Sequence, residues 1–206
     1  MKFSKLLVAS IAAGLCIGLG GAVFLAVDNK IVGSLLFVLG LFTICTRGFS
    51  LFTGKVGYAL GQPPAYWMEL AVIWIGNLIG TNLVAYALRA TRVCAAFAAK
   101  AEGICAIKAE DSLLSLFLLG IFCNILMFIA VDGFRNNPHE VGKYIGLFLG
   151  VSVFILAGFE HCIADMFYFG MANAWSADIV IRLLVITAGN LVGDLAFPVL
   201  EKLLKN

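Results

Sequence analysis

Glu160 and His161 are adjacent ionisable residues inside an otherwise apolar stretch of the chain. An imidazole exchanges a proton near neutral pH, so His161 can act as a proton donor to a weak acid. The alternative interpretation is structural, in which the ring hydrogen-bonds to backbone groups that a helix break leaves free. Asp165 follows one helical turn later, with Cys162 between them. Because a metal site needs three or more ligands and the other histidine, His139, lies in a predicted loop, we expect no metal and no cofactor.

A second polar segment interrupts the apolar pattern in the first half of the chain, at residues 50–55. Thr53 supplies a hydroxyl group there, and the backbone N–H groups of the segment can bind an anion. The nearby cations Lys55 and Arg47 can assist, although a basic side chain at a helix end more often extends to the membrane interface. Asn124 is a further polar group in an apolar stretch. Helix-to-helix hydrogen bonding and pore lining are equally compatible with its position.

The composition indicates that a membrane surrounds these groups. Of the 206 residues, 62% are hydrophobic and only 13% are charged, which is about half the charged share of a soluble globular protein. One core cannot hide that much apolar material, so a water-soluble protein is excluded and the lipid bilayer is the expected partner. The net charge of +2, without a basic run, excludes nucleic-acid binding. The six cysteines show no C-x-x-C spacing and predict no disulfide framework.

The lengths of the apolar segments predict an all-α, polytopic membrane protein with six transmembrane helices. A helix needs about 20 mostly apolar residues to cross the hydrocarbon core. Four segments meet this requirement, and they cover residues 6–27, 65–88, 112–131 and 179–200. Although Lys2 and Lys5 precede the first of them, no cleavage site follows, so we interpret it as a membrane helix and not as a signal peptide.

The second and fifth spans are predicted to be discontinuous. Residues 31–46 form a shorter apolar segment, which is interrupted and then resumes briefly to Leu60. Residues 144–159 run into Glu160 and His161, after which a helical pattern restarts through residues 166–171. Two broken helices in one membrane protein indicate that the breaks line a cavity, because free backbone groups cannot face lipid.

The two halves of the chain resemble one another. FLAVD at 24–28 recurs as FIAVD at 128–132, and GNLIG at 76–80 recurs as GNLVG at 189–193, with the two breaks at matching positions between them. The paired glycines of these motifs are predicted to allow close helix packing. Because each unit contains three spans, the second unit must be inverted relative to the first. Inverted repeats with matching broken helices indicate a substrate path near the bilayer midplane.

A single transmembrane domain is therefore expected over residues 1–206. Its first repeat covers about 4–90 and its second about 112–202. The connection at about 89–111 is rich in alanine and predicts a short amphipathic or interfacial helix. Lys and Arg residues divide six and six between the two sides of the membrane, so the positive-inside rule gives no orientation.

Several motifs, in order along the chain, carry a family resemblance. They are Leu51-Phe52-Thr53-Gly54 in the broken second span, GIFCN at 120–124, GFEHCIADM at 158–166, and the paired Gly-Asn-Leu-x-Gly of the third and sixth spans. With these motifs the sequence resembles the formate/nitrite transporter family over nearly its whole length. The resemblance implies a homopentamer with one aquaporin-like pore in each protomer, located in the cell membrane with both termini in the cytoplasm.

The resemblance also implies roles for individual residues. By motif position, His161 corresponds to the central pore histidine, Thr53 to the threonine of the loop that breaks the second helix, and Asn124 to the pore asparagine. Lys108, sixteen residues before Asn124, matches the lysine of the outer vestibule. Two apolar constrictions are implied, formed by Leu51, Phe52 and Phe37 or Leu41 on the inner side and by Phe154 on the outer side.

Three features depart from the pattern of the family. The family usually has an acidic residue directly before Leu-Phe-Thr, whereas this chain has Ser50, so we expect a different anchoring of the loop. Lys55 is an additional cation near the loop, and its effect on anion affinity is open. Because the first span begins almost at Met1, we do not expect the amphipathic N-terminal helix of the family or gating through it.

Together these features predict a membrane channel or transporter for small monovalent anions of weak acids, namely formate, nitrite or hydrosulfide. We expect Lys108 to concentrate the anion and the apolar rings to remove its water, which favours the neutral acid. We expect His161 to supply a proton or a hydrogen bond, Glu160 to pair with Lys108, and Asn124 and Thr53 to orient the oxygen atoms of the anion. The physiological anion, and the choice between passive conduction and proton symport, are open at this point.

Two other classes of function were weighed. A membrane-embedded enzyme would use His161, Asp165 and Cys162, but a reactive site also needs a partner on a second helix, which the sequence does not offer. A structural scaffold would explain the glycine packing but not the Glu160-His161 pair at membrane depth. We therefore expect no enzymatic activity.

Overall fold

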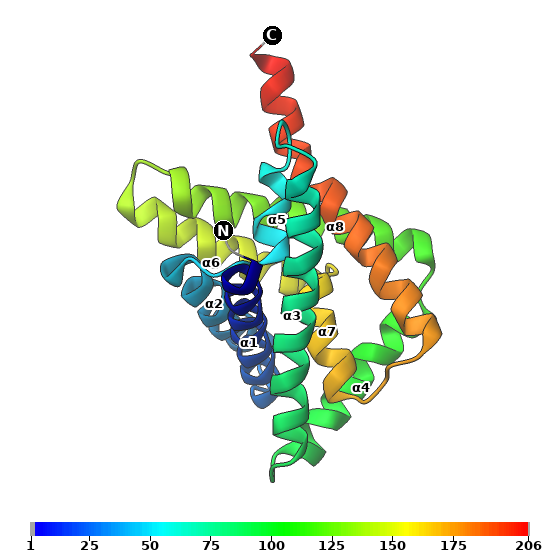
Figure 1. Cartoon of the computed structure of the whole chain (residues 1–206). Helices are drawn as coiled ribbons and strands as arrows, with labels where there is room; N and C mark the ends of the chain where they lie inside the picture. The colour runs from blue at the N-terminus through cyan, green and yellow to red at the C-terminus, as the bar shows by residue number, and fades with distance from the viewer. Residues whose placement is uncertain (1–2, 206) are drawn as a thin grey trace.

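The computed structural model describes residues 3–205, so Met1, Lys2 and Asn206, at the ends of the predicted domain, lie outside the described residues. All regular structure between residues 3 and 205 is helical. Figure 1 shows the arrangement of the elements, whose bounds are α1 Phe3–Ala26, α2 Lys30–Arg47, the short 3₁₀ turns η1 Phe52–Gly54 and η2 Val56–Tyr58, α3 Ala65–Arg89, α4 Cys94–Glu110, α5 Leu113–Asn136, α6 Glu140–Ala157, α7 Cys162–Met171 and α8 Ala177–Leu204.

Six of these helices are long and apolar enough to cross a membrane, namely α1, α2, α3, α5, α6 and α8. Each begins and ends within a few residues of a predicted span. The predicted all-α fold with six membrane-spanning helices is therefore confirmed. The alanine-rich connection also forms a helix, α4, as its composition predicted.

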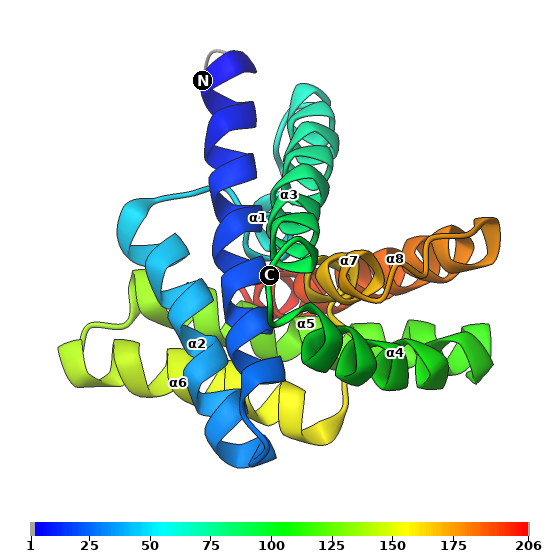
Figure 2. The ribbon, with the colours of Figure 1, turned by 90° about the horizontal axis from the view of Figure 1, so that it is seen from below.

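The long helices pack in the same pairs in each half of the chain. α1 packs against α3 and α2, and α5 packs against α8 and α6. Figures 1 and 2 both show α1 lying beside α3. A Cβ atom added at Gly80 would lie 2.8 Å from the Cα atom of Gly14, and one added at Gly189 would lie 3.2 Å from the Cα atom of Gly120. The glycines of the repeated motif thus allow the close packing that the sequence predicted.

Two glycines end the helices that precede the breaks. Gly48 has a φ of 69° after α2, and Gly158 has a φ of 74° after α6. Glycine adopts this left-handed conformation without the steric cost that a Cβ atom brings, and it terminates a helix for that reason. The two discontinuous segments therefore begin in the same way.

The two breaks continue differently. After Gly158 the chain crosses three residues and enters α7 at Cys162, four residues earlier than the predicted restart at residue 166. After Gly48 the brief apolar continuation to Leu60 contains only η1 and η2, of three residues each. Glycines recur through this stretch, and glycine lowers helix propensity by about 1 kcal/mol per residue.

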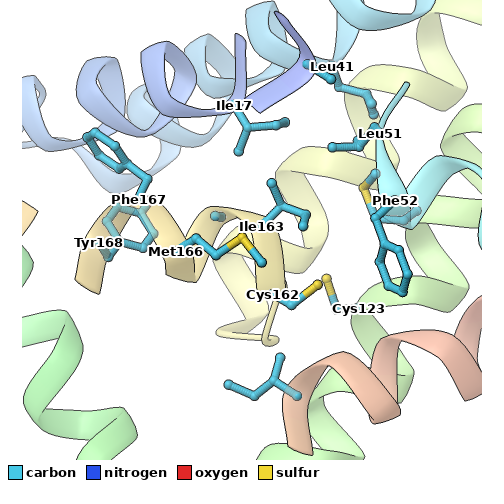
Figure 3. Packing of buried hydrophobic residues seen from close by; sticks show 14 of the residues in the cluster. Ile17, Leu41, Leu51, Phe52, Cys123, Cys162, Ile163, Met166, Phe167 and Tyr168 are labelled. Carbon is cyan, nitrogen blue, oxygen red and sulfur yellow. The ribbon is translucent and has the colours of Figure 1, made fainter. Parts of the chain in front are cut away.

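The short helix α7 forms the centre of the bundle. Every one of its ten residues is buried. It packs against α3, α4, α1 and α8. Figure 3 shows Ile163, Met166 and Phe167 of α7 among the side chains of the core. The buried helix fixes the position of the residues at its N-terminus, among them His161.

Candidate functional site

Two asparagines, one in each half, hold the broken segments through matching hydrogen bonds. Asn77 of α3 donates to the carbonyl oxygens of Ser10 (2.7 Å) and Ser50 (3.0 Å) and accepts from the N–H group of Phe52 (2.9 Å). In this clamp two bonds hold the break, and the bond to Ser10 joins α3 to α1. Buried polar groups need such partners, so Asn77 fixes the path of the chain through the first break.

Asn190 of α8 makes the same three bonds in the second half. It donates to the carbonyl oxygens of Gly120 (2.9 Å) and Glu160 (2.8 Å) and accepts from the N–H group of Cys162 (2.8 Å). The equivalent break residues, Ser50 with Glu160 and Phe52 with Cys162, are 110 positions apart. The sequence analysis assigned the glycines of the Gly-Asn-Leu-x-Gly motif but missed its asparagines, although an asparagine repeated in two apolar spans was a usable signal.

His161 and Thr53 meet where the two breaks come together. The Nε2 atom of His161 lies 2.9 Å from the Oγ1 atom of Thr53, and the Nδ1 atom accepts the N–H group of Ala164 at 3.1 Å. Because Nδ1 acts as the acceptor, the ring proton is assigned to Nε2, which donates to Thr53. One nitrogen of His161 therefore caps α7, as the structural interpretation expected, and the other presents a donor at the break.

Lys108 forms a buried ion-pair cluster with two carboxylates. Its Nζ atom contacts Oε2 of Glu160 and lies 2.9 Å from Oδ1 of Asp165. The pairing of Lys108 with Glu160 is as expected from the sequence. Asp165 was considered only as a partner of His161, and its contact with Lys108 was missed because it depends on how α4 packs against α7.

Arg182 holds α4 in the position that this cluster requires. Its guanidinium on α8 donates to the carbonyl oxygens of Lys108 (3.1 Å) and Asp111 (2.6 Å), at the end of α4. On the same helix, Ala101 and Cys105 are buried on the face that carries Lys108. The connecting helix is thus part of the site and not only a link between the repeats.

A cavity of about 190 Å³ lies against His161 and the ion-pair cluster. A hollow of about 10–15 Å³ by this measure holds one water, so the cavity has room for a small anion with part of its hydration shell. Phe37 and Phe154 line it together with Lys108 and His161. The ring of Phe154 stacks on that of His161, with centroids 5.4 Å apart. The site therefore combines a cation, a hydrogen-bond donor and an apolar wall.

Comparison with known proteins agrees with this geometry. A family model described as formate/nitrite transporter matches residues 1–202. The chain belongs to the formate/nitrite transporter family. Transport across a membrane is accordingly its function, and it is a multi-pass membrane protein.

Individual members of the family are similar over most of their length. The chain is 29% identical to a probable formate transporter of Methanothermobacter thermautotrophicus, over 94% of this chain and 85% of that one. It is 26% identical to the nitrite transporter NirC of Escherichia coli (strain K12), over 92% and 79% respectively. A solved structure of a pentameric formate channel with formate bound superimposes with a TM-score of 0.86 at 26% identity, covering 98% of this chain and 96% of that one.

In this formate/nitrite transporter, the predicted constriction residues divide into two groups. Phe37 packs edge-on against Phe154, with ring centroids 6.5 Å apart, on the cavity side of His161. Leu41 and Leu51 instead line a separate hollow of about 10 Å³, which is about the space that one water needs. Of the two candidates for the inner group, the structure thus places Leu41 beside Leu51 and Phe37 with Phe154.

Phe52 belongs to neither group. It is buried, and Figure 3 shows its ring turned away from Leu41 and Leu51. Neither hollow is lined by Phe52 within residues 3–205. Phe52 contributes to the site through its backbone N–H group, which donates to Asn77 and so helps to fix the path of the first break.

Asn124 is fully buried on α5, and neither atom of its amide has a hydrogen-bond partner within the described part of the chain. The helix-to-helix hydrogen bond that its position allowed is therefore not formed. A buried amide without partners is costly unless a water or a ligand satisfies it. This observation favours the pore-lining interpretation.

The loop of the first break has an anchor that the sequence analysis missed. Asp194 of α8 accepts the N–H group of Gly57 in η2 at 2.5 Å. Ser50 is buried at the place of the usual acidic residue, and Tyr66 donates to the carbonyl oxygen of Lys55 at 2.8 Å. A carboxylate directly after the second Gly-Asn-Leu-x-Gly motif was the signal that could have indicated this contact.

The residues considered for an enzyme do not form a reactive group. Both ring nitrogens of His161 are occupied, one by Thr53 and the other by the N–H group of Ala164. The carboxylate of Asp165 faces Lys108. Neither arrangement activates Cys162 as a nucleophile, because activation needs a base within hydrogen-bond reach.

Proposed function

We propose that this protein conducts small monovalent anions of weak acids along a path from the cavity, past His161 and Thr53, to Leu51. The observation that carries the proposal is the contact between His161 and Thr53, which joins the two breaks at the end of a cavity that also contains Lys108. Formate and nitrite are the first candidates, because relatives bear the names formate transporter and nitrite transporter. Hydrosulfide is a third candidate of similar size and charge.

The path imposes a desolvation step on the anion. Lys108 supplies a positive charge near the cavity, while Phe37 and Phe154 replace water with apolar surface. Removing water raises the pKa of an acid and favours its neutral form. The Nε2–H group of His161 donates to Thr53 in the structure, and it stabilises the anion by exchanging this hydrogen bond for one to the anion. Proton transfer to the anion requires that the ring first take up a second proton at Nδ1 and so become an imidazolium. In that case transport is coupled to protons.

In this proposal Thr53 and Asn124 orient the oxygen atoms of the anion by hydrogen bonds. The hydroxyl group of Thr53 accepts from His161 and keeps its own hydrogen free to donate. Asn124 offers an amide that has no protein partner between residues 3 and 205. The hollow at Leu41 and Leu51 has room for about one water, so anion passage requires these side chains to separate.

The assembly and location follow from the family. We propose a homopentamer in the cell membrane, with one pore in each protomer, both termini in the cytoplasm and a single transmembrane domain built from two inverted repeats. The matching clamps of Asn77 and Asn190 support the repeats, and the pentameric formate channel with a TM-score of 0.86 supports the assembly.

Flux into vesicles tests the proposal. Purified protein is reconstituted into liposomes, and the uptake of formate, nitrite and hydrosulfide is compared with uptake into protein-free liposomes over a pH series. We expect at least one of the three anions to enter faster with the protein present. Equal uptake of all three with and without protein would refute the proposed function.

A further inference from the structure

Lys108, Glu160 and Asp165 contain one cation and two carboxyl groups, and we call them the charge triad. Each of the three residues is at most 7% exposed. Lys108 contacts both carboxyl groups at once, and all three residues line the cavity beside His161. The proposed path uses Lys108 and Glu160 but gives Asp165 no task.

The charges of the triad do not balance if both carboxyl groups are ionised. The other titratable groups near Asp165 are neutral thiols, a phenol and an imidazole, namely Cys105 of α4, Cys123 of α5, Cys162 and Tyr168 of α7, and His161 at the start of α7. Lys30 of α2 also lines the cavity, but it is exposed and donates to the carbonyl oxygen of Leu156. Among the described residues, only Lys108 contacts the two carboxyl groups as a cation.

A buried net charge is unfavourable, and two carboxyl groups that share one site do not ionise together easily. One proton held by the pair makes the triad neutral. The geometry offers a place for it, because Oδ1 of Asp165 faces Lys108 while Oδ2 is buried without a hydrogen-bond partner among residues 3–205. An ionised Oδ2 in that position would lack any compensation.

We propose that Asp165 holds a proton on its Oδ2 atom at neutral pH, and that loss of this proton closes the cavity to anions by giving the triad a net negative charge. The inference rests on the proposed function, since it assigns regulation of anion entry to the same cavity. The sign follows directly. At a pH where Asp165 keeps its proton, one carboxylate balances the charge of Lys108, and the anion meets a cavity wall without net charge. At a higher pH Asp165 loses the proton, and the second carboxylate repels the anion.

The variant Asp165→Asn tests this assignment because it keeps the shape of the side chain but cannot ionise. Formate uptake is measured in proteoliposomes with equal pH inside and outside, from about pH 6 to about pH 9. We expect wild-type uptake to fall on the alkaline side by about tenfold, the order of magnitude by which a local charge alters ion entry. Asp165→Asn is expected to match the wild type at the acidic end and to lose most of the alkaline fall.

The matched control is Glu140→Gln, which removes one carboxylate at the start of α6. Glu140 is exposed and pairs with Lys143, outside the triad. This control is expected to keep the wild-type profile. If it flattened the profile as Asp165→Asn does, a general surface charge would explain the effect and the proposal would be overturned.

Infrared spectroscopy provides a readout that is independent of transport. A carbonyl band of protonated carboxylic acid is expected in the wild-type protein at neutral pH, and Asp165→Asn is expected to lose the component that belongs to Asp165. Because Asp194 also has a buried oxygen without a partner among residues 3–205, the component is identified from the difference between the two spectra. A wild-type spectrum without this band would overturn the proposal even if the variant failed to fold. No uptake of any of the three anions by the wild type would refute the proposed function itself, whereas active wild type and variant with superimposable pH profiles would refute only the assignment of Asp165.

Discussion

The first break, at Thr53, and the second, at His161, share one frame but differ in their chemistry. In both, a left-handed glycine ends the preceding helix, and an asparagine makes two matching bonds to the following segment and a third to a neighbouring long helix. The second break then enters the buried helix α7 and is surrounded by the charge triad, whereas the first continues as two 3₁₀ turns. The repeat therefore fixes the path of the backbone at each break, while the side chains around the break differ between the two halves.

The residues that meet between the two breaks illustrate this division. At the offset of 110 that relates the clamps, the counterpart of His161 is Leu51, and the counterpart of Thr53 is Ile163. Thr53 and His161 therefore contact each other without being equivalent. A donor from one half meets a hydroxyl group from the other, and the equivalent positions are apolar.

The largest expected effect comes from breaking the shared frame. Asn190→Leu leaves the carbonyl oxygens of Gly120 and Glu160 and the N–H group of Cys162 without their partner. Each unsatisfied buried group costs about 1–3 kcal/mol, so we expect a large drop in melting temperature and in yield. Asn136→Leu changes an exposed asparagine at the end of α5 and serves as the control. A normal melting temperature for Asn190→Leu would contradict the role of the clamp.

The next effect concerns the contact between the breaks. Thr53→Val removes the acceptor of the His161 Nε2–H group, and we expect a loss of about 1–3 kcal/mol together with slower formate uptake. Thr46→Val removes an exposed hydroxyl group that bonds only within α2, and its expected effect is within about 0.5 kcal/mol. Thermal melting and proteoliposome flux measure both. Unchanged formate uptake by Thr53→Val would show that the contact between Thr53 and His161 is not part of the path of the anion.

A smaller effect is expected at the anchor of the first break. Asp194→Leu removes the acceptor of the Gly57 N–H group, and we expect faster hydrogen exchange at η2 and a stability loss of about 1–3 kcal/mol. Asp194→Asn keeps an oxygen acceptor and is expected to retain most of the protection. If both variants exchanged like the wild type, the loop would have another anchor.

The smallest effect lies outside the membrane spans, at the connection between α1 and α2. A hydrogen bond and the charge of Lys100, 2.8 Å away, lower the pKa of the Asp28 carboxyl. Because this pKa is lower in the folded state, the pair stabilises the protein above the usual carboxyl pKa of about 4 and loses that effect as the pH falls through the lowered pKa. We expect the small difference in melting temperature between wild type and Asp28→Asn to vanish in acid. A difference that persists in acid would contradict this origin.

The sequence predicted those features of the fold that depend on local composition. The apolar lengths predicted six spans, and the structure has six helices long and apolar enough to cross a membrane. This prediction succeeded because the length and composition of a spanning helix are properties of a short segment. The resemblance to the family added the expected pairing of Lys108 with Glu160, which the structure contains.

The remaining features depend on contacts between distant segments. The placement of Phe37 beside Phe154, the approach of Lys108 to Asp165, and the anchor at Asp194 all follow from how whole helices pack. No local pattern encodes the first two contacts, and Asp194 was recognisable only by its place after a repeated motif. The short 3₁₀ turns combine both kinds of cause, because local glycines disfavour a helix and bonds to Asn77 and Asp194 of distant helices fix the path of the segment.

The pH dependence of formate uptake by His161→Phe and His161→Asn tests the central claim most directly. Asparagine retains a side-chain acceptor for the N-terminus of α7 but lacks the imidazole Nε2–H group, whereas phenylalanine lacks both. Comparing the two variants therefore separates the capping of α7 from the role of the imidazole in transport. We predict that both variants fold and that both depart from the wild-type profile between about pH 5 and pH 8, where an imidazole exchanges its proton. Wild-type profiles in both variants would contradict the account, because anions would then cross without His161.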